Sequence, residues 1–343
     1  MRALLIPRPG ELQLTDLTKP EIGPFEALVR IRGCGICATT DWELIHGRQP
    51  FHRDYPAILG HEAVGEVVET GPKVQSFHTG DFVKRPVAIW PGEKRGGFAS
   101  AWGGFAEYGI VRDRIALVQA GQDSYKNDYT ALRQQVVPAG LALPDAILAI
   151  SLSETASWFR HLPSVAGKSV CISGTGVAGL SMIFWSLLGG AEKIFVLGRR
   201  DTRLDLARRL GATHGINVQK GPVATQLRDL NGGAGVDFFL EAVGLPDQIN
   251  LGLSLLAPGG ILAIYGVPEG QRYELAWSTC PERAKIVNLP AEEHLAYGWV
   301  ADLIRRGMLP TREVMTHSWK FDQFREAFDA VAAGDVVKGW IEI

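Results

Sequence analysis

Hydrophobic and polar residues are patterned differently in the two parts of the chain. Up to about Gly140 the apolar residues form short runs bounded by turn residues, with little helical periodicity, and such runs predict β-strands. From Leu141 to Pro163 apolar residues recur at helical spacing and predict a connecting helix. The sequence therefore predicts a β-rich, partly barrel-like domain over residues 1–150.

From Lys168 onward, strand and helix patterns alternate. The segments KSVCISG, KIFVLG, VDFFLEAVG and GGILAIYG are continuous apolar runs, as expected for strands buried on both faces, and amphipathic segments separate them. This alternation predicts an α/β fold with a doubly wound parallel sheet over residues 151–291. Two amphipathic helices and the strand VVKGWIEI follow, and we expect residues 292–343 to return to the first domain.

Composition and charge exclude several classes of protein. The formal net charge is -2, so no global field favours nucleic acid or an anionic membrane as a partner. The N-terminus lacks the long apolar region of a secretory signal, and no apolar stretch reaches the roughly 20 residues of a membrane span. Four scattered cysteines do not form a disulfide framework. We expect a cytoplasmic protein with reduced thiols.

A glycine-rich motif begins the parallel-sheet region. Gly174, Gly176 and Gly179 form Gly-x-Gly-x-x-Gly directly after a predicted strand, and Val177 and Ala178 open the following helix. These glycines permit a tight turn and close approach of the backbone to a pyrophosphate, while the helix N-terminus offers unpaired N–H groups. A glycine-rich turn without a ligand is the alternative, but the flanking strand and helix favour a dinucleotide site.

The end of the next predicted strand favours NADP(H) over NAD(H). An NAD site usually has Asp or Glu there to bind the ribose 2'-hydroxyl, whereas this strand ends in Gly198, Arg199 and Arg200. A small residue followed by guanidinium groups accommodates a 2'-phosphate. The alternative is that both arginines are solvated and that Asp201 binds the ribose; its position suggests instead the N-cap of the next helix.

Four residues, far apart in the chain, could together bind a metal ion. Cys37, His61 and Glu154, with Glu62 beside His61, offer a thiolate, an imidazole and carboxylates. This donor set suits Zn²⁺, and three protein ligands with one open position are typical of a catalytic zinc. Taken singly, each has a structural explanation, such as a buried thiol or a core histidine.

The motifs together resemble the medium-chain zinc-dependent alcohol dehydrogenase family. CGIC with ATTD, LGHEAVGEVVETG, GGFAEY, the glycine-rich unit and LARRLGATHGIN occur in that family's order across nearly the whole chain. The resemblance implies a GroES-like catalytic domain interrupted by a Rossmann domain. It also implies that Cys37 and His61 bind zinc.

The same resemblance suggests roles for further residues. It implies that Glu62 is a carboxylate able to exchange onto the metal and that Glu154 is the third protein ligand, as in the polyol dehydrogenase branch. Thr39 matches the hydroxyl that relays the alcohol proton, although one extra residue in ATTD leaves Thr40 as an alternative. Lys338 matches a basic position that meets the pyrophosphate; a solvated lysine is the alternative.

The sequence also departs from the family pattern. Many relatives hold a second, structural zinc with four cysteines, but residues 85–101 contain none, so we expect one catalytic zinc and no structural zinc. Glu154 is followed by Thr155 and Ala156 where polyol enzymes often have Pro and Leu.

These observations predict an oxidoreductase that moves a hydride between a secondary alcohol, such as a polyol or sugar derivative, and NADP(H). The partners expected are a small alcohol or carbonyl substrate and further copies of the chain, in a dimer or tetramer. The alternatives are a zinc-free NADPH quinone or enone reductase and a non-catalytic NADPH-binding protein. Four aromatic residues either border the substrate cleft or pack within the domain: Trp42, Trp90, Phe98 and Trp102.

Overall fold

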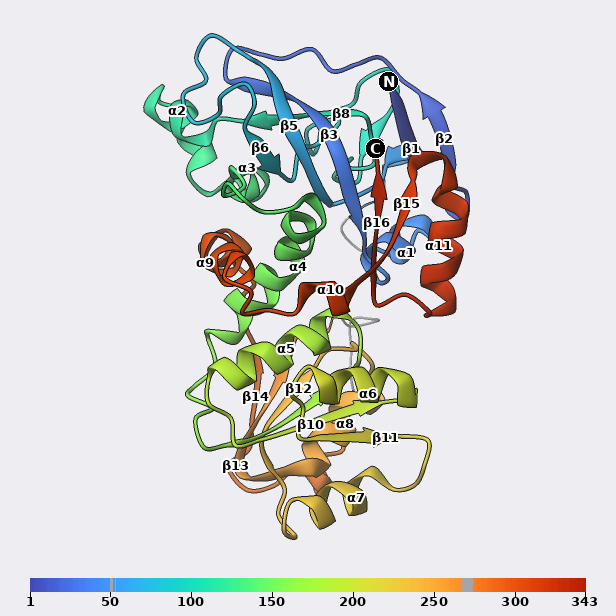
Figure 1. Ribbon diagram of the computed structural model, residues 1–343, viewed down its shortest axis with the longest axis vertical. Helices are drawn as coiled ribbons and strands as arrows, with labels where there is room; N and C mark the ends of the chain where they lie inside the picture. Colours follow the sequence, from blue (N-terminus) through green and yellow to red (C-terminus); the bar gives the residue numbers. More distant parts are fainter. Residues whose placement is uncertain (50–51, 53, 267–273) are drawn as a thin grey trace. The chain divides into compact units, whose positions relative to one another are not determined.

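The computed structural model describes residues 1–49, 52, 54–266 and 274–343. It divides into two compact units, the first made of Met1–Ser151 and Tyr297–Ile343 and the second of Leu152–Ala296 (Figure 1). The boundaries fall inside two helices, α4 (Leu143–Phe159) and α9 (Glu293–Arg305).

The first unit is built around two β-sheets. One has the order β2-β1-β4-β7, and the other has the order β15-β16-β3-β5-β6 with β8 also paired to β3. Their strands are β1 (Arg2–Ile6), β2 (Gln13–Asp16), β3 (Glu26–Ile36), β4 (Ala57–Ile58), β5 (Glu62–Thr70), β6 (Phe82–Lys84), β7 (Ala99–Ser100), β8 (Tyr108–Arg112), β15 (Met315–Lys320) and β16 (Lys338–Glu342).

The longest strand of this unit, β3, organises its sheet. It pairs antiparallel with β5, β8 and β16, and nearly all its side chains are buried. The pairing of β16 with β3 confirms that the C-terminal segment returns to the first domain, as its strand pattern predicted. A buried apolar cluster that includes Leu4, Ile31, Phe105 and Ile341 fills the space between these strands and α11 (Phe324–Ala333).

Short helices connect the strands of the first unit, so this part is less purely β than the sequence predicted. Each occupies a segment between strands where the apolar pattern is too short to suggest a helix. They are α1 (Thr40–Ile45), α2 (Arg114–Gln119), α3 (Tyr129–Arg133), α10 (Thr311–Val314) and the 3-10 turns η1 (Asp123–Asn127) and η3 (Phe321–Gln323).

The second unit is a six-stranded parallel sheet with the order β11-β10-β9-β12-β13-β14. The predicted parallel sheet is therefore confirmed. Because the chain moves outward from β9 first to one edge and then to the other, the strand order reverses beside β9, where such folds bind ligands. The strands are β9 (Ser169–Ser173), β10 (Lys193–Gly198), β11 (His214–Asn217), β12 (Val236–Glu241), β13 (Leu256–Ile264) and β14 (Lys285–Asn288).

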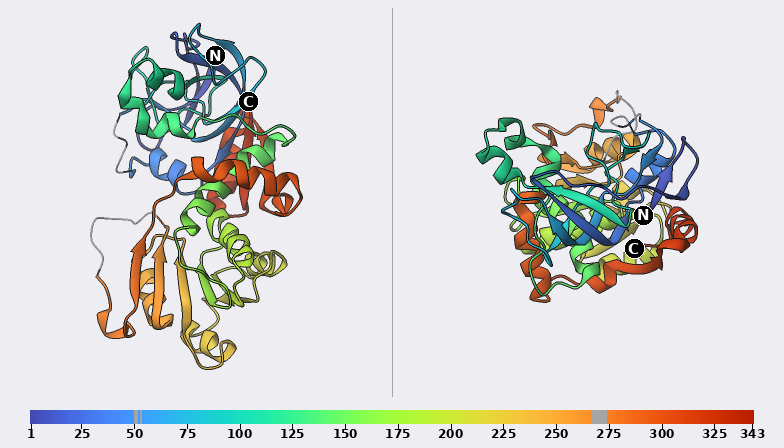
Figure 2. Two further views of the ribbon diagram at one scale, coloured as in Figure 1. Left: turned by 90° about the vertical axis from the view of Figure 1, so that its left-hand side faces the viewer. Right: turned by 90° about the horizontal axis from the view of Figure 1, so that it is seen from above.

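Helices cover this sheet, as continuous apolar strands require. Figure 2 shows α5 and α6 together on one side of it, and α8 packs on β12 and β13. These elements are α5 (Val177–Leu188), α6 (Asp201–Arg209), α7 (Val223–Leu230), α8 (Pro246–Leu255) and the turn η2 (Trp277–Thr279). Within the described ranges, no helix has the length and apolar character needed to cross a membrane.

One buried carboxylate fastens three segments of the first unit. Asp113 caps α2 by accepting from the Ala116 N–H, and it also accepts from the N–H groups of Gln75 and Ser76 and from the Ser76 hydroxyl. Burial alone raises the pKa of Asp113, but these hydrogen bonds outweigh burial and leave the pKa below its usual value. The ionised form is therefore the one that the fold stabilises.

We predict that Asp113→Ala lowers the free energy of unfolding by about 2–4 kcal/mol at neutral pH, because several donors lose their acceptor. Because the folded-state pKa is depressed, this stabilisation is complete above the unfolded pKa of about 3.9 and is lost as the pH falls through the folded value. Urea unfolding at pH 7 and near pH 3 should show that the difference in unfolding free energy between wild type and variant becomes smaller in acid.

Asp128→Ala, which removes only the cap of α3, is the matched control and should lower the free energy of unfolding by about 1 kcal/mol. Equal losses in the two variants would contradict the prediction.

Candidate metal centre and dinucleotide loop

Three strand ends of the first unit meet at one edge of its larger sheet. Cys37 directly follows β3, Glu62 begins β5, and Lys338 begins β16. The antiparallel register pairs Gly35 with Glu62 and Ile36 with Gly339. The hydrogen-bonded register of three strands thus brings together residues that are far apart in the chain.

The ligand atoms of Cys37, His61 and Glu62 all lie within 4.8 Å of one another. Donor atoms bound to Zn²⁺ in a tetrahedron, at about 2.0–2.3 Å, lie roughly 3.3–3.8 Å apart. A thiolate, an imidazole and a carboxylate form a donor set that zinc prefers. These three residues therefore fit the metal that the sequence predicts.

Asp41 orients the imidazole of His61. Its carboxylate is fully buried, Oδ1 lies 3.2 Å from His61 Nδ1, and Oδ2 accepts a hydrogen bond of 2.9 Å from the Cys37 N–H. With Nδ1 facing a carboxylate, Nε2 is left for the thiol or a metal, an arrangement common around metal-binding histidines. The sequence predicts no role for Asp41, although its position four residues after Cys37, on the first turn of α1, is a signal that points to one.

Mutual electrostatic contacts favour the charged forms in this centre. Burial raises the pKa of the Cys37 thiol, but the hydrogen bond and charge of His61 outweigh burial and lower it. Burial lowers the pKa of His61, but the charges of Asp41 and Cys37 and their hydrogen bonds outweigh burial and raise the pKa overall. A divalent cation bound here would require Cys37 and His61 to give up their protons, because metal ligands must be deprotonated.

Glu62 is held between a serine and a lysine. Its Oε1 accepts a hydrogen bond of 2.8 Å from the Ser151 hydroxyl on α4, and its Oε2 contacts the ammonium of Lys338. Burial raises the pKa of Glu62, but the charges of Lys338 and His61 and these hydrogen bonds lower it overall. Lys338 is only 2% exposed, so the alternative of a solvated lysine is wrong. Its contact with a pyrophosphate stays a prediction.

The structure places the other predicted site residues as follows. Thr39 is exposed at the start of α1, whereas Thr40 is half-buried and directly precedes Asp41, so the choice between the two hydroxyls stays open. Glu154 lies on α4 three residues after Ser151, in the part of the helix that belongs to the second unit. Its role as a zinc ligand stays a prediction.

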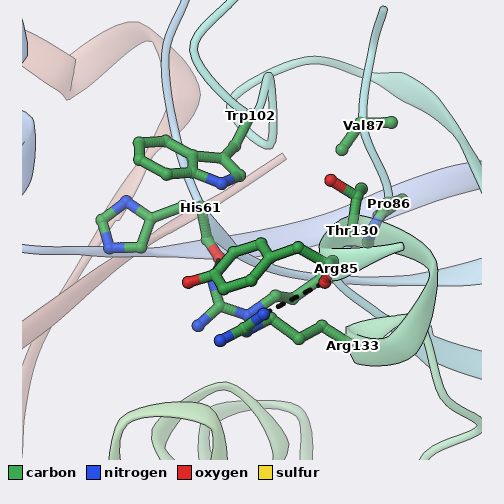
Figure 3. A pocket seen from close by; sticks show the side chains of 8 residues that line it. His61, Arg85, Pro86, Val87, Trp102, Thr130 and Arg133 are labelled. Carbon is green, nitrogen blue, oxygen red and sulfur yellow. Dashed lines mark hydrogen bonds between the residues drawn. The ribbon is translucent and has the colours of Figure 1, made fainter. Parts of the chain in front are cut away.

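A small pocket adjoins the metal centre within the first unit (Figure 3). It encloses about 260 Å³, counting space open to solvent. The ring of Trp102 lies 5.2 Å from that of His61 and forms one wall, whereas Trp90 packs in a separate buried cluster. The residues that line the pocket include His61, Arg85, Trp102, Tyr129, Thr130 and Arg133.

The glycine-rich loop of the second unit has the geometry that dinucleotide binding requires. Gly174 has φ +114°, which favours glycine, and a Cβ on Gly179 would lie 2.1 Å from the Gly174 carbonyl oxygen. A Cβ on Gly176 would meet nothing within 4 Å, so the loop is open there. Gly176 caps α5 without a side-chain hydrogen bond, and Val177 and Ala178 begin the helix, so its first N–H groups can bind a phosphate.

The end of β10 differs in one respect from the prediction. Helix α6 begins at Asp201 with Arg200 as the N-cap, so Asp201 is the first helical residue and not the cap. Its carboxylate instead accepts hydrogen bonds from Asn217 at 2.8 Å and from Lys220 at 2.6 Å. This side-chain pairing with the neighbouring strand outweighs the capping preference of aspartate. Arg199 and Arg200 are exposed.

Known proteins match both units. The family described as "Alcohol dehydrogenase GroES-like domain" matches residues 23–120, and "Zinc-binding dehydrogenase" matches residues 178–284. L-threonine 3-dehydrogenase of Pyrococcus horikoshii is 30% identical, covering 98% of this chain and 97% of its own. The enzyme of that name from Pyrococcus abyssi is 31% identical, covering 95% and 93%.

Among solved structures, alcohol dehydrogenase TADH from Thermus sp. ATN1 superposes with a TM-score of 0.82 at 25% identity, covering 100% of this chain and 99% of that one. The similarity thus extends over the metal centre, the glycine-rich loop and the returning C-terminal strand together. Because sequence and fold agree over nearly the whole length, the protein belongs to the medium-chain zinc-dependent alcohol dehydrogenase family and is an oxidoreductase that acts on alcohols with a nicotinamide cofactor.

Proposed function

We propose that this protein transfers a hydride between a secondary alcohol and NADP(H) at a single catalytic zinc. The observation that carries the proposal is the convergence of Cys37, His61 and Glu62 within 4.8 Å, with Asp41 behind His61. A zinc-free reductase has no need of a thiolate and an imidazole paired in this way. We expect the active protein to be a homo-oligomer.

We propose that Cys37, His61 and Glu154 hold the zinc and that Glu62 exchanges onto it. Bound Zn²⁺ supplies Lewis acidity, which eases deprotonation of an alcohol and reduction of a carbonyl. Asp41 keeps the imidazole in the orientation and tautomer that binding requires. Ser151 and Lys338 each contact one oxygen of the Glu62 carboxylate. These contacts would hold Glu62 near the zinc while it is not bound to the metal.

The position of Glu154 on its helix supports its proposed role. Residues three apart on an α-helix lie on the same face, and Ser151, three residues before Glu154, donates to Glu62 of the metal centre. Glu154 is also only partly buried, as a ligand bordering a substrate site would be. With Cys37 it would supply two negative charges to balance a divalent cation.

The preference for NADP(H) is supported by the end of β10. A Cβ on Gly198 would lie 2.7 Å from Thr175 Cγ2 in the glycine-rich loop, so the aspartate typical of NAD sites would not fit there without rearrangement. Arg199 and Arg200 are exposed beside it and could pair with a 2'-phosphate. Asp201 is engaged with Asn217 and Lys220 and is therefore a poor ribose ligand.

The substrate proposed from the resemblance is a polyol or sugar derivative with a secondary hydroxyl. The relatives from Pyrococcus are named for L-threonine, which also has a secondary hydroxyl, at the oxidised carbon. Both classes share a small, polar carbon skeleton.

The central test compares Cys37→Ser with Cys280→Ser, which changes a free thiol of the second unit. We predict about one zinc per chain in wild type and in Cys280→Ser. Cys37→Ser should lose most of its zinc, because removing a ligand weakens the site. Elemental analysis gives the metal content, and nicotinamide absorbance with a panel of secondary alcohols gives turnover. Zinc-free wild-type protein that reduces quinones or enones would contradict the proposal.

We predict that Glu154→Gln weakens zinc binding by at least about 10-fold, because an anionic ligand is replaced by a neutral amide. Competition with a chromogenic chelator measures the affinity. Glu326→Gln, an exposed carboxylate on α11, is the control and should bind zinc like wild type. Unchanged affinity in Glu154→Gln would remove Glu154 from the ligand set and leave the Cys37 centre standing.

For the cofactor, we predict that Arg199→Asp combined with Arg200→Ala lowers NADPH affinity by about 10- to 100-fold and favours NADH, because the charges that pair with a 2'-phosphate are removed. Nicotinamide fluorescence measures both affinities. Arg208→Ala, which removes one exposed positive charge at the last turn of α6, is the control and should retain the preference of wild type. If the double variant retained its full preference for NADPH, these arginines would not select the cofactor.

A further inference from the structure

The turn that follows β12 lies beside the glycine-rich loop of the second unit. The Ala242 N–H donates to the Ser173 carbonyl at 3.0 Å, and a Cβ on Gly174 would lie 3.2 Å from Val243 Cγ2. Since β9 and β12 are neighbours in the parallel sheet, their carboxyl ends open onto the same edge. The turn over residues 242–244 therefore borders the candidate phosphate loop.

The strand order indicates which half of a dinucleotide would meet this turn. In folds of this kind the pyrophosphate lies at the glycine-rich turn, and the adenosine ribose meets the end of the next strand. Here those places are the loop after β9 and the end of β10. Because β10 and β12 flank β9 on opposite sides, the half that carries the nicotinamide would extend over the end of β12.

Val243 is exposed at this edge. A single exposed apolar side chain is ordinary on a protein surface. Val243, however, is 40% exposed where the strand order reverses beside β9, and its methyl groups lie against Gly174. Cofactor sites are lined mostly by apolar side chains with a few polar groups. The position of Val243 is therefore that of a side chain that packs against the nucleotide.

A buried carboxylate fixes the backbone of the turn. The Oε1 of Glu241 accepts hydrogen bonds from the N–H groups of Val243 at 2.7 Å and of Gly244 at 2.9 Å. Its Oε2 lies 3.0 Å from the same Gly244 nitrogen. Because Glu241 is fully buried, bulk water does not compete for these donors.

The end of β13 holds Glu241 from the other side. The Glu241 carbonyl accepts from the N–H groups of Tyr265 at 2.8 Å and of Gly266 at 3.0 Å. A Cβ on Gly266 would lie 2.2 Å from the Gly244 nitrogen and 2.7 Å from Glu241 Oε2. The two segments are thus in close contact, which leaves the turn little space to shift.

A carboxylate is costly at this position. Burial raises the pKa of Glu241 above its usual value, although the hydrogen bonds from Gly244 and Val243 oppose this effect. An apolar side chain would avoid the cost of burying a charge, but it would leave these two N–H groups without their acceptor. The chain therefore keeps a costly group at the end of β12 that borders the phosphate loop.

We propose that Glu241 is a positioning residue for the nicotinamide half of the cofactor. It holds the turn over residues 242–244 so that the Val243 side chain packs against the nucleotide beyond the pyrophosphate. The inference goes beyond the proposed function, because it depends neither on the zinc ligands nor on the choice between NADP(H) and NAD(H). It requires only the nicotinamide cofactor common to the family.

The test compares whole dinucleotides with their adenosine halves. Calorimetry on the full-length, zinc-loaded protein gives the Kd of NADPH and of adenosine 2',5'-bisphosphate, and likewise of NADH and of AMP. In each pair, the ratio of the fragment Kd to the dinucleotide Kd measures what the nicotinamide half adds to affinity. The pair that wild type binds more tightly is then used for the variants.

Glu241→Gln is the main variant. It is nearly isosteric and keeps one acceptor oxygen, but its amide N–H groups would face the Gly244 N–H, so the turn must shift. We expect the ratio to fall by about fivefold or more, while the affinity for the adenosine fragment stays as in wild type.

Asp237→Asn is the matched control. Asp237 lies near the other end of β12, and its carboxylate accepts from the Ser169 N–H at 2.9 Å and from the Ser169 hydroxyl at 2.8 Å. A loss of stability in this strand that has no bearing on the cofactor would affect both variants alike. We expect Asp237→Asn to lower the thermal stability and to keep the wild-type ratio.

Val243→Ala tests the contact itself. Its side chain is partly exposed, so the substitution does not threaten the fold. We expect the ratio to fall by about threefold or more, because apolar contact with the nucleotide is lost. In the Glu241→Gln background the same substitution should have a smaller effect, since Glu241 acts through Val243 and the two changes are then not additive.

The inference is overturned by any of three results: a wild-type ratio in folded Glu241→Gln, an equal loss of affinity for fragment and dinucleotide, or the same fall of the ratio in Asp237→Asn. If Glu241→Gln yields no folded protein, Glu241→Asp takes its place and is judged by the same ratio, because it keeps the charge but shortens the side chain. Zinc content and alcohol turnover of wild type, measured separately, decide the proposed function.

Discussion

The hydrogen-bonded register of β3 with β5 and β16 is the constraint on which the metal centre depends. It aligns the end of one strand with the starts of two others, so that Cys37, Glu62 and Lys338 meet at one edge of the sheet. A shift of one residue would turn every side chain of a strand to the opposite face. The buried side chains of β3 prevent such a shift, because the apolar core of the first unit accepts only one register.

The same edge gathers charges that would be costly to bury singly. Asp41, His61 and Cys37 form one sequence of contacts, and Glu62 and Lys338 form another beside it. Each buried group has a partner of opposite charge or a hydrogen-bond donor, which offsets the cost of removing it from water. The centre is thereby preorganised: the ligand atoms of Cys37, His61 and Glu62 already lie within 4.8 Å of one another, and binding of a divalent cation would be accompanied by deprotonation of its ligands.

In the second unit, the candidate phosphate site consists of backbone groups. Its glycine-rich loop could receive a phosphate without a charged side chain, because the first N–H groups of α5 lack helical partners and a Cβ at Gly176 would meet nothing within 4 Å. In the proposed site, discrimination between the two nicotinamide dinucleotides falls to the end of β10. There Gly198 packs against Thr175 of the loop, so the two parts of the nucleotide site constrain each other.

The sequence alone determined what depends on local pattern. Periodicity predicted the strands of both units and the helices of the second, but not the short helices of the first. The residue types of Cys37, His61 and Glu62, together with the family resemblance of the motifs around them, predicted the metal centre, and the glycine-rich motif predicted the phosphate loop. Only the tertiary structure showed that Asp41 supports His61, that Lys338 is buried against Glu62, and that Arg85 and Arg133 line one pocket. These contacts join residues from separate strands and turns. The physical reason is that the pairing and packing of distant segments decide which side chains meet, and no local pattern in the chain records that choice.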